Sequence, residues 1–339
     1  MPNSIAYIQN YTTMLDRVYQ RESVSGCLTS GPRMVRAGRN AREIMIPKIE
    51  VTGLGDYTRN VGYQTGSITY EYETKTFNYD RGIRLFADVM DVEEAGVLDC
   101  FVAAGAELQR TQVAPEADAF TFAQIAGHTG VDVTTEDLSS ADADDVLAAL
   151  RTVTSAMDEA QVTQGSRYLF ITPTLRGILD DYSYANPNRS NRVLERFARV
   201  IEVPSVRFYT HIELLPGSND EFGYKCQEQT YKKTSDVALV EGKTYYTKSG
   251  DVYTPVAEPD VSDIATYYEV DVAGGQAINF MVVEKSAVIK FDKHVASRVF
   301  QPDELESLDS YMMKYRKYGI VELLDNKLAG VHVSAAPLA

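Results

Sequence analysis

Residues 68–76 alternate between two kinds of side chain, and this is the clearest pattern along the chain. One face carries Ile68, Tyr70, Tyr72, Thr74 and Thr76, and the other carries Thr69, Glu71, Glu73 and Lys75. A period of two predicts a β-strand with one polar face. Isoleucines and the turn-rich residues 53–57 come before it, so residues 41–86 are predicted to form a long β-hairpin. An isolated hairpin is marginally stable in water, so we expect this one to lie on a partner surface or at the edge of the chain's own sheet.

Apolar residues three or four positions apart predict helices after the hairpin. Residues 91–111 are predicted to form a long helix with acidic residues at its start, and Pro115 is predicted to open a second helix. Ser139, with Asp142 three residues later, resembles a capping box and predicts a third helix that ends near Ala160. The positions of this third helix that we expect to face inward are Val146, Leu147, Leu150, Val153 and Met157.

The remainder of the chain mixes apolar strands with short helices, which predicts the α+β fold class. Strands are expected at 167–172, within 199–215, and at 277–283, 288–291, 318–324 and 328–333. Helices are expected from Pro173 and, over 304–311, after Pro302. Residues 228–271 contain the sequence Thr-Tyr-Tyr twice, on either side of a turn, and are predicted to form a small β insertion.

Residues 1–40 differ from the rest in charge and pattern. They carry five arginines against two acidic residues, a net +3, which leaves −18 for the rest of a chain whose total is −15. No core-forming period is visible after Ser23. A basic arm on an acidic body indicates a segment that lies across a neighbouring copy, with Arg33, Arg36 and Arg39 as candidate contacts. A solvated tail is the alternative.

Composition narrows the function classes. A net charge of −15 argues against a protein that grips nucleic acid, although not against one that encloses it. No run approaches the apolar length of a membrane helix, so no membrane association is expected. The 22 tyrosines suit large interfaces, because a tyrosine ring buries area while its hydroxyl stays hydrogen-bonded. Three cysteines far apart in sequence fit a reducing cytosol.

No segment has the pattern of a catalytic, cofactor or metal site. The four histidines lie far from one another and from any cysteine at ligand spacing. The acids at 142, 144 and 145 lack the glycine and glutamate of a calcium loop and are better explained as helix caps. The glycines at 53 and 55 precede no helix, which excludes a dinucleotide loop. We therefore predict a structural protein, not an enzyme, with no cofactor.

Four stretches resemble the major capsid proteins of tailed bacteriophages. They are "IPKIEVTGLGDYTRNVGY" (46–63), "YETKTFNYDRGIRLFADVMDVEEAG" (72–96), "VAPEADAFTFAQIA" (113–126) and "RYLFITPTLRGILDD" (167–181). The order of the predicted elements is also similar to that family, over about 41–230 and 275–335.

The resemblance implies the tailed-phage capsid (Johnson) fold and names for its parts. Residues 1–40 would be the N-arm and 41–86 the extended β-hairpin loop. Residues 87–127 and 290–339 would form the peripheral domain, with its spine helix. Residues 128–289 would form the axial domain, with 228–271 as its insertion.

The resemblance also implies function and partners. The chain would assemble with itself into hexamers and pentamers of an icosahedral head shell that encloses double-stranded DNA without sequence-specific binding. Further partners in that family would be a portal protein and separate scaffold or decoration proteins. The localisation would be the virion, with assembly in the host cytoplasm. Candidate inter-subunit contacts are Arg33, Arg36, Arg39, Ile68, Tyr70, Tyr72 and Lys75. An encapsulin-like nanocompartment, another virion or tail protein, and an enzyme of a different class remain the alternatives.

Overall fold

The computed structural model describes residues 23–29, 36–37, 42–60, 62–90, 105–186, 191–218, 220–236, 238–240, 243–256, 259–260, 264, 266–304 and 310–338. These residues divide into two compact units. The first takes residues from 1–115 and 285–328, and the second from 116–284 and 329–339. In the described part of the chain, no helix is both long and apolar enough to span a membrane.

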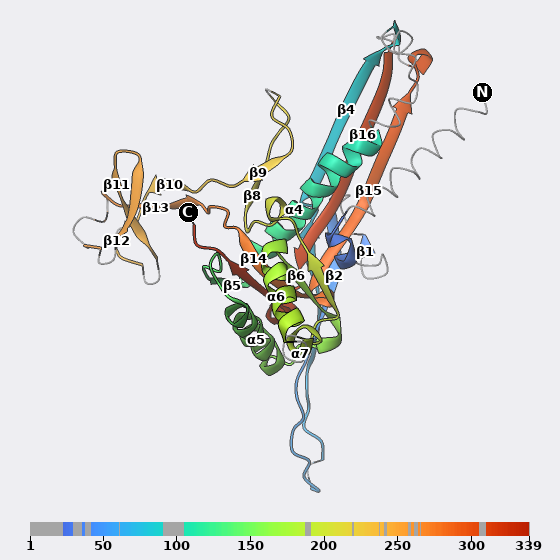
Figure 1. Cartoon of the computed structure of the whole chain (residues 1–339). Helices are drawn as coiled ribbons and strands as arrows, with labels where there is room; N and C mark the ends of the chain where they lie inside the picture. Colours follow the sequence, from blue (N-terminus) through green and yellow to red (C-terminus); the bar gives the residue numbers. More distant parts are fainter. Residues whose placement is uncertain are drawn as a thin grey trace. The chain divides into compact units, whose positions relative to one another are not determined.

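A long antiparallel sheet forms the centre of the first unit. Its order is β15 (Val288–Phe300), β16 (Ser310–Leu323) and β4 (Tyr79–Asp88), drawn side by side in Figure 1. β16 pairs with β15 over twelve positions and with β4 over ten. One face packs Met313 against Leu85, Val299 and the helical residue Leu108.

A hairpin of β2 (Glu43–Val51) and β3 (Ile68–Thr76) precedes this sheet, and the short strand β1 (Arg36–Ala37) pairs with β2. The strand predicted at 68–76 is thus confirmed. The hairpin, however, ends at Thr76, and the next strand, β4, belongs to the long sheet. Asn78 marks the change of direction, because its side chain exchanges two hydrogen bonds with the backbone of Val321.

The turn η1 (Ser25–Leu28) is attached to β15 in the same unit. Ser25 and Leu28 are fully buried. Lys290, itself buried, donates from Nζ to the backbone oxygen of Ser25 at 3.3 Å and also to its hydroxyl. A buried ammonium needs such acceptors, so this contact fixes residues 25–28 on the body of their own subunit.

The second unit is built on a mixed sheet with the order β5-β17-β14-β6-β7. The strands are β5 (Asp132–Thr135), β6 (Arg167–Ile171), β7 (Arg199–Glu202), β14 (Ile278–Glu284) and β17 (Val331–Ala335). Helices α5 (Ala143–Glu159) and α6 (Pro173–Ala185) contribute to its core, and α7 (Asn191–Leu194) follows them. The predicted strand at 167–172 and the helix after Pro173 are confirmed, as are all five predicted inward residues of α5.

Two smaller sheets complete the second unit. β8 (Ile212–Leu214) pairs with β9 (Tyr224–Cys226). A four-stranded antiparallel sheet has the order β10-β13-β11-β12. Its strands are β10 (Thr230–Lys233), β11 (Tyr245–Ser249), β12 (Val252–Val256) and β13 (Tyr268–Val272).

Two predicted helix starts were wrong. α5 is capped by Asp142 and not by Ser139, because Asp142 and Asp145 form the capping box with each other's backbone amides. Pro115 opens no new helix: residues 105–126 are helical throughout, with a π-helical turn at Gln109–Val113 directly before α4 (Ala114–Ala126). A proline cannot donate the usual helical hydrogen bond, and the wider π turn next to it tolerates that loss.

Three further predictions need correction. Ser310 and Tyr311 begin the long strand β16 and are not helical. β17 closes the sheet of the second unit, between β14 and β5, and not the long sheet of the first, because its apolar positions are fully buried there. Residues 116–127, which were expected in the peripheral domain, also belong to the second unit.

Candidate subunit-contact surface

The base of the β2–β3 hairpin is anchored on its own unit. Ile44 and Ile46 are buried and pack with Ile289 of β15 and Ile320 of β16. Glu73 and Lys75 lie opposite these isoleucines in the β2–β3 register. The face of the hairpin that looked polar in sequence is therefore the face that packs on the body, near its base.

The other face of the hairpin is an exposed apolar ladder. In register, Pro47 lies opposite Tyr72, Ile49 opposite Tyr70 and Val51 opposite Ile68, so the ladder consists of Pro47, Ile49, Val51, Ile68, Tyr70 and Tyr72. Exposure rises from 42% for Tyr72 through 51% for Tyr70 to 74% for Ile68. The rings of Tyr70 and Tyr72 touch edge to face, with centroids 5.1 Å apart. A contiguous apolar surface of this kind marks an interaction site, whereas scattered apolar residues do not.

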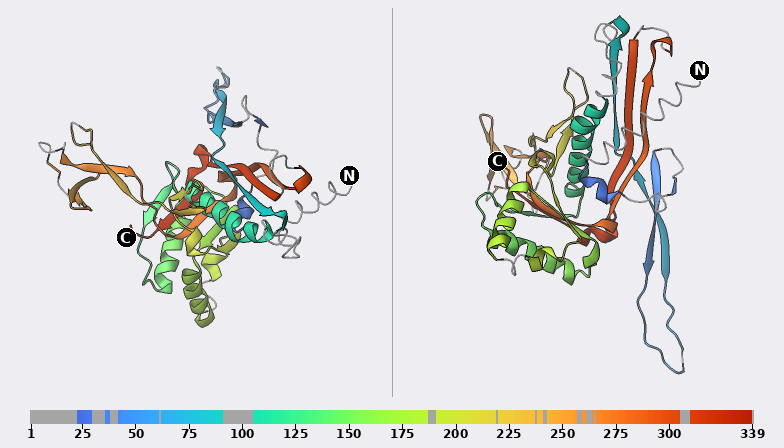
Figure 2. Two further views of the ribbon diagram at one scale, coloured as in Figure 1. Left: turned by 90° about the horizontal axis from the view of Figure 1, so that it is seen from above. Right: turned by 45° about the vertical axis from the view of Figure 1, so that its right-hand side comes forward.

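The ladder continues into the tip of the hairpin, residues 52–67. Leu54 is fully exposed, and the rings of Tyr57 and Tyr63 contact each other in a tilted arrangement with centroids 4.9 Å apart. Backbone hydrogen bonds between Thr58 and Gly62 close the turn. Figure 2 shows the two strands running side by side to this tip. The tip adds aromatic and aliphatic area to the same contact surface.

The structure describes some of the contact residues predicted from sequence and leaves others outside the described ranges. Ile68, Tyr70 and Tyr72 come together on the ladder. Arg33 and Arg39 lie outside the described residues, and Arg36 is described only through its backbone pairing with Met45.

Lys75 is held by carboxylates of its own chain. Its ammonium lies 2.9 Å from Glu73 and 3.5 Å from Asp325 in the same chain. Burial acts to lower the pKa of Lys75, but the hydrogen bond to Glu73 and the nearby carboxylates outweigh it and raise that pKa. These intrachain partners already balance the charge of Lys75 within the subunit.

Sequence reasoning missed Pro47, Ile49 and Val51 as members of the ladder, and it missed the apolar tip. The signal for Ile49 and Val51 was present, since both are apolar and two positions apart. A register is needed to show that they share a face with Tyr70. The tip has no period, so pattern alone cannot assign its side chains to a surface.

In the described part of the chain, no metal-binding cluster competes with this surface. Among the residues that the structure describes, no three histidine, cysteine or acidic side chains gather so that they could hold a metal ion. Asp142 and Asp145, part of the acidic group of the sequence, cap α5.

Comparison with solved structures identifies the fold. No family model and no curated protein matches the sequence. The structure is similar to the capsid of the cyanophage P-SCSP1u, with a TM-score of 0.51 and 14% identity over 90% of this chain and 86% of that one. It is similar to the mature capsid of bacteriophage PhiM1, with a TM-score of 0.51 and 13% identity over 88% and 83%.

A virus-like particle from Pyrococcus furiosus is similar to the same degree. Its TM-score is 0.51, with 7% identity over 97% of this chain and 99% of that one. The chain therefore has the tailed-phage capsid (Johnson) fold, and the predicted fold class is confirmed.

Proposed function

We propose that this chain is the major subunit of a closed protein shell, with a structural and not a catalytic role. The observation that carries the proposal is the exposed apolar ladder of the hairpin, on a chain with a capsid fold. An exposed ladder of six apolar residues is unfavourable in water for an isolated subunit and favourable once a neighbouring copy covers it. Ile68, Tyr70 and Tyr72 are the proposed contacts, together with Arg33, Arg36 and Arg39 of the arm.

The specific form that we favour is the icosahedral head of a tailed phage. The chain would form hexamers and pentamers around double-stranded DNA, and it would be found in the virion after assembly in the host cytoplasm. In the vocabulary of that fold, 1–40 would be the N-arm, 41–76 the extended loop and 128–284 most of the axial domain. A portal protein and a scaffold or decoration protein are further proposed partners.

A second form is an encapsulin-like nanocompartment, which would hold protein cargo in place of a genome. The likeness to the virus-like particle of Pyrococcus furiosus supports this alternative, because it covers nearly all of both chains. Neither form requires the acidic body of the subunit to bind DNA tightly, since closure of the wall retains the content.

Electron microscopy of the purified full-length protein tests the proposal. Closed shells built from this chain are expected, and a monodisperse monomer at high concentration, with or without a scaffold protein, would refute it. The contents separate the two forms: nuclease-protected double-stranded DNA in particles from infected or induced cells supports the head, and co-purified protein without DNA supports the compartment.

A further inference from the structure

The open face of the long sheet carries three cations in a line. In the register of the sheet, Lys314 on β16 lies opposite both Arg84 on β4 and Arg298 on β15. All three residues are exposed. They point away from the face on which Met313 packs, because neighbouring positions of a strand alternate between faces. We call these three residues the basic row.

The basic row has no carboxylate partner in the part of the chain that the structure describes. Each cation lies over an aromatic ring instead. The Arg84 guanidinium is 5.4 Å from the centre of the Phe86 ring, and Arg298 and Lys314 are 5.5 and 4.7 Å from that of Phe300. The rings carry no net charge, and like charges directly opposite one another destabilise a sheet. An uncompensated row of this kind indicates an anionic partner.

An apolar row runs beside the basic row on the same face. It consists of Phe86, Met312 and Phe300, which lie opposite one another in the register, two positions along each strand from the cations. Two positions of a strand span about 6.7 Å. Phe86 is 45% exposed although its side chain is large and apolar. The face therefore presents a charged line and an apolar line in parallel, both running across the strands.

The spacing within the basic row fits an α-helix. Directly opposite residues of antiparallel strands are about 4.5–5.5 Å apart, so the two outer residues of the row are about 10 Å apart across the sheet. Acidic residues at positions i, i+4 and i+7 of a helix share one face and span about 10.5 Å. Three acidic residues on one face of an extended strand would span about 13 Å. A helix that crosses the strands therefore matches the row better than an extended segment does.

We infer that the open face of the long sheet binds an acidic amphipathic helix of a protein partner. The carboxylates of that helix face the basic row, and its apolar side chains cover the exposed ring of Phe86. Arginine can pair both oxygens of a carboxylate, which makes the contact specific as well as attractive. The inference goes beyond the proposed shell and does not require closed shells to form.

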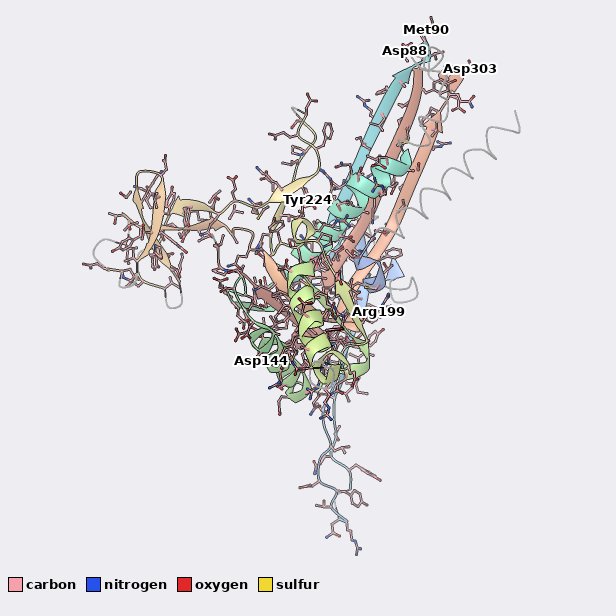
Figure 3. All side chains as sticks on the ribbon, viewed as in Figure 1. Asp88, Met90, Asp144, Arg199, Tyr224 and Asp303 are labelled. Atoms are coloured by element: carbon pink, nitrogen blue, oxygen red, sulfur yellow. The ribbon has the colours of Figure 1, made fainter. Side chains whose placement is uncertain are left out.

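Two other occupants fit this face less well. In their described parts, α4, α5 and α6 have no acidic residues spaced i, i+4 and i+7, so these helices of a second copy do not match the row. A long nucleic acid would meet Asp88, which is labelled in Figure 3 and lies four positions from Arg84 on the same face of β4. That distance is about 13 Å. The net charge of −15 would repel the remainder of a polyanion beyond the three cations.

A labelled synthetic helix tests the inference on the full-length protein. The probe is an alanine-rich peptide of about 20 residues, long enough to be helical, with glutamates at i, i+4 and i+7 and leucines on the adjacent stripe. The control peptide has the same composition, with its glutamates spread around the helix. Fluorescence anisotropy measures the binding of each peptide at low ionic strength, where contacts between surface charges are screened least.

Three variants separate the contributions of the face. The row variant is Arg84→Gln/Arg298→Gln/Lys314→Gln, and Phe86→Thr removes the exposed ring without changing the charge. The control variant, Arg151→Gln/Arg199→Gln/Lys225→Gln, removes the same charge at exposed positions elsewhere. The row variant should fold, because loss of mutually repelling charges does not destabilise a sheet, and circular dichroism checks this.

The probe should bind the wild type and the control variant equally, and about tenfold more tightly than the control peptide does. The row variant should bind the probe about tenfold more weakly than the wild type. Phe86→Thr should weaken binding roughly fivefold, because an apolar contact is lost while every charge remains. Added salt should weaken binding of the probe to the wild type.

Several results would overturn the inference. Equal binding of the two peptides to the wild type would show that the protein does not select an acidic stripe, and this comparison depends on no variant. Unchanged binding of the probe by the row variant would place the peptide elsewhere. Duplex DNA that binds the wild type more tightly than the probe, and is lost in the row variant, would make nucleic acid the partner. Loss of assembly in the row variant, with no binding of the probe to the wild type, would make a second copy the partner. Absence of closed shells, by contrast, refutes only the proposed function.

Discussion

The apolar ladder gives the sharpest quantitative prediction. Ile49 and Tyr70 face each other across β2 and β3 and remain 59% and 51% exposed. Full burial of such a side chain contributes about 1.5–3 kcal/mol. Roughly half of that free energy remains to be gained for each side chain when a neighbour covers the pair. Removal of both side chains should therefore cost about 2 kcal/mol of assembly free energy per copy. The double variant Ile49→Thr/Tyr70→Thr should therefore raise the concentration needed for assembly about 30-fold.

The same double variant should leave the isolated subunit nearly unchanged, because threonine suits a strand and exposed substitutions shift stability by less than about 0.5 kcal/mol. Light scattering over a concentration series measures assembly, and urea denaturation measures the subunit. The matched control is Lys48→Thr/Glu71→Thr, a pair at the same height on the opposite face of the hairpin. Assembly of the ladder variant at the wild-type concentration, or an equal loss in the control, would refute the reasoning.

Four further predictions concern the subunit itself; urea denaturation reads out the first three, and solubility reads out the fourth. Leu150→Ala, in the core of the second unit, should lower the free energy of unfolding by about 3 kcal/mol through a cavity. Asp142→Ala should cost about 1 kcal/mol by removing the cap of α5, whereas Ser139→Ala should be almost neutral; the reverse order would contradict the observed cap. Burial lowers the pKa of His332 in the folded chain below its usual value near 6.5. As the pH falls, the unfolded chain therefore binds a proton at this histidine before the folded chain does. Stability should then fall as pH drops below about 6.5, and His332→Gln should flatten that dependence; an unchanged slope would exclude this histidine as its source. Replacing residues 230–271 with a short Gly/Ser linker should leave a soluble, folded chain, since Thr230 and Val272 are cross-strand neighbours; insolubility would assign the segment to the core.

Elements with strong local signals could be predicted from sequence. The alternation at 68–76 and the apolar run at 167–171 each became a strand. The first has one apolar and one polar face, and the second is buried at nearly every position, which favours a continuous apolar run. Pro173 correctly marked the first turn of α6.

The long sheet of the first unit was harder to predict. β16 buries Lys317, whose ammonium lies 3.2 Å from Asp292, and a buried charge breaks the expected alternation of apolar and polar positions. Only the apolar end of the strand was therefore found. The position of β17 in the second unit depends on tertiary pairing with β14, which no local pattern contains.

The candidate surface was half visible in sequence for a similar reason. One strand of the hairpin shows its exposed face by alternation, but the partner residues follow only from the register. The alignment of Arg84, Arg298 and Lys314 across the long sheet was not visible in sequence, because these residues come from three separate parts of the chain. Three strands must pair before these charges stand in line.

The long register of β16 also has a mechanical consequence. Hydrogen bonds of an antiparallel ladder lie across the strands, and here they tie one strand to two partners over twelve and ten positions. A pull along the strands must shear all of these bonds at once, whereas a pull across the sheet can peel them apart in succession. In a wall under outward pressure, a subunit pulled along β16 would resist extension. Failure under load is then expected first at the joints between copies, where a few side chains carry the force, and only later within the sheet.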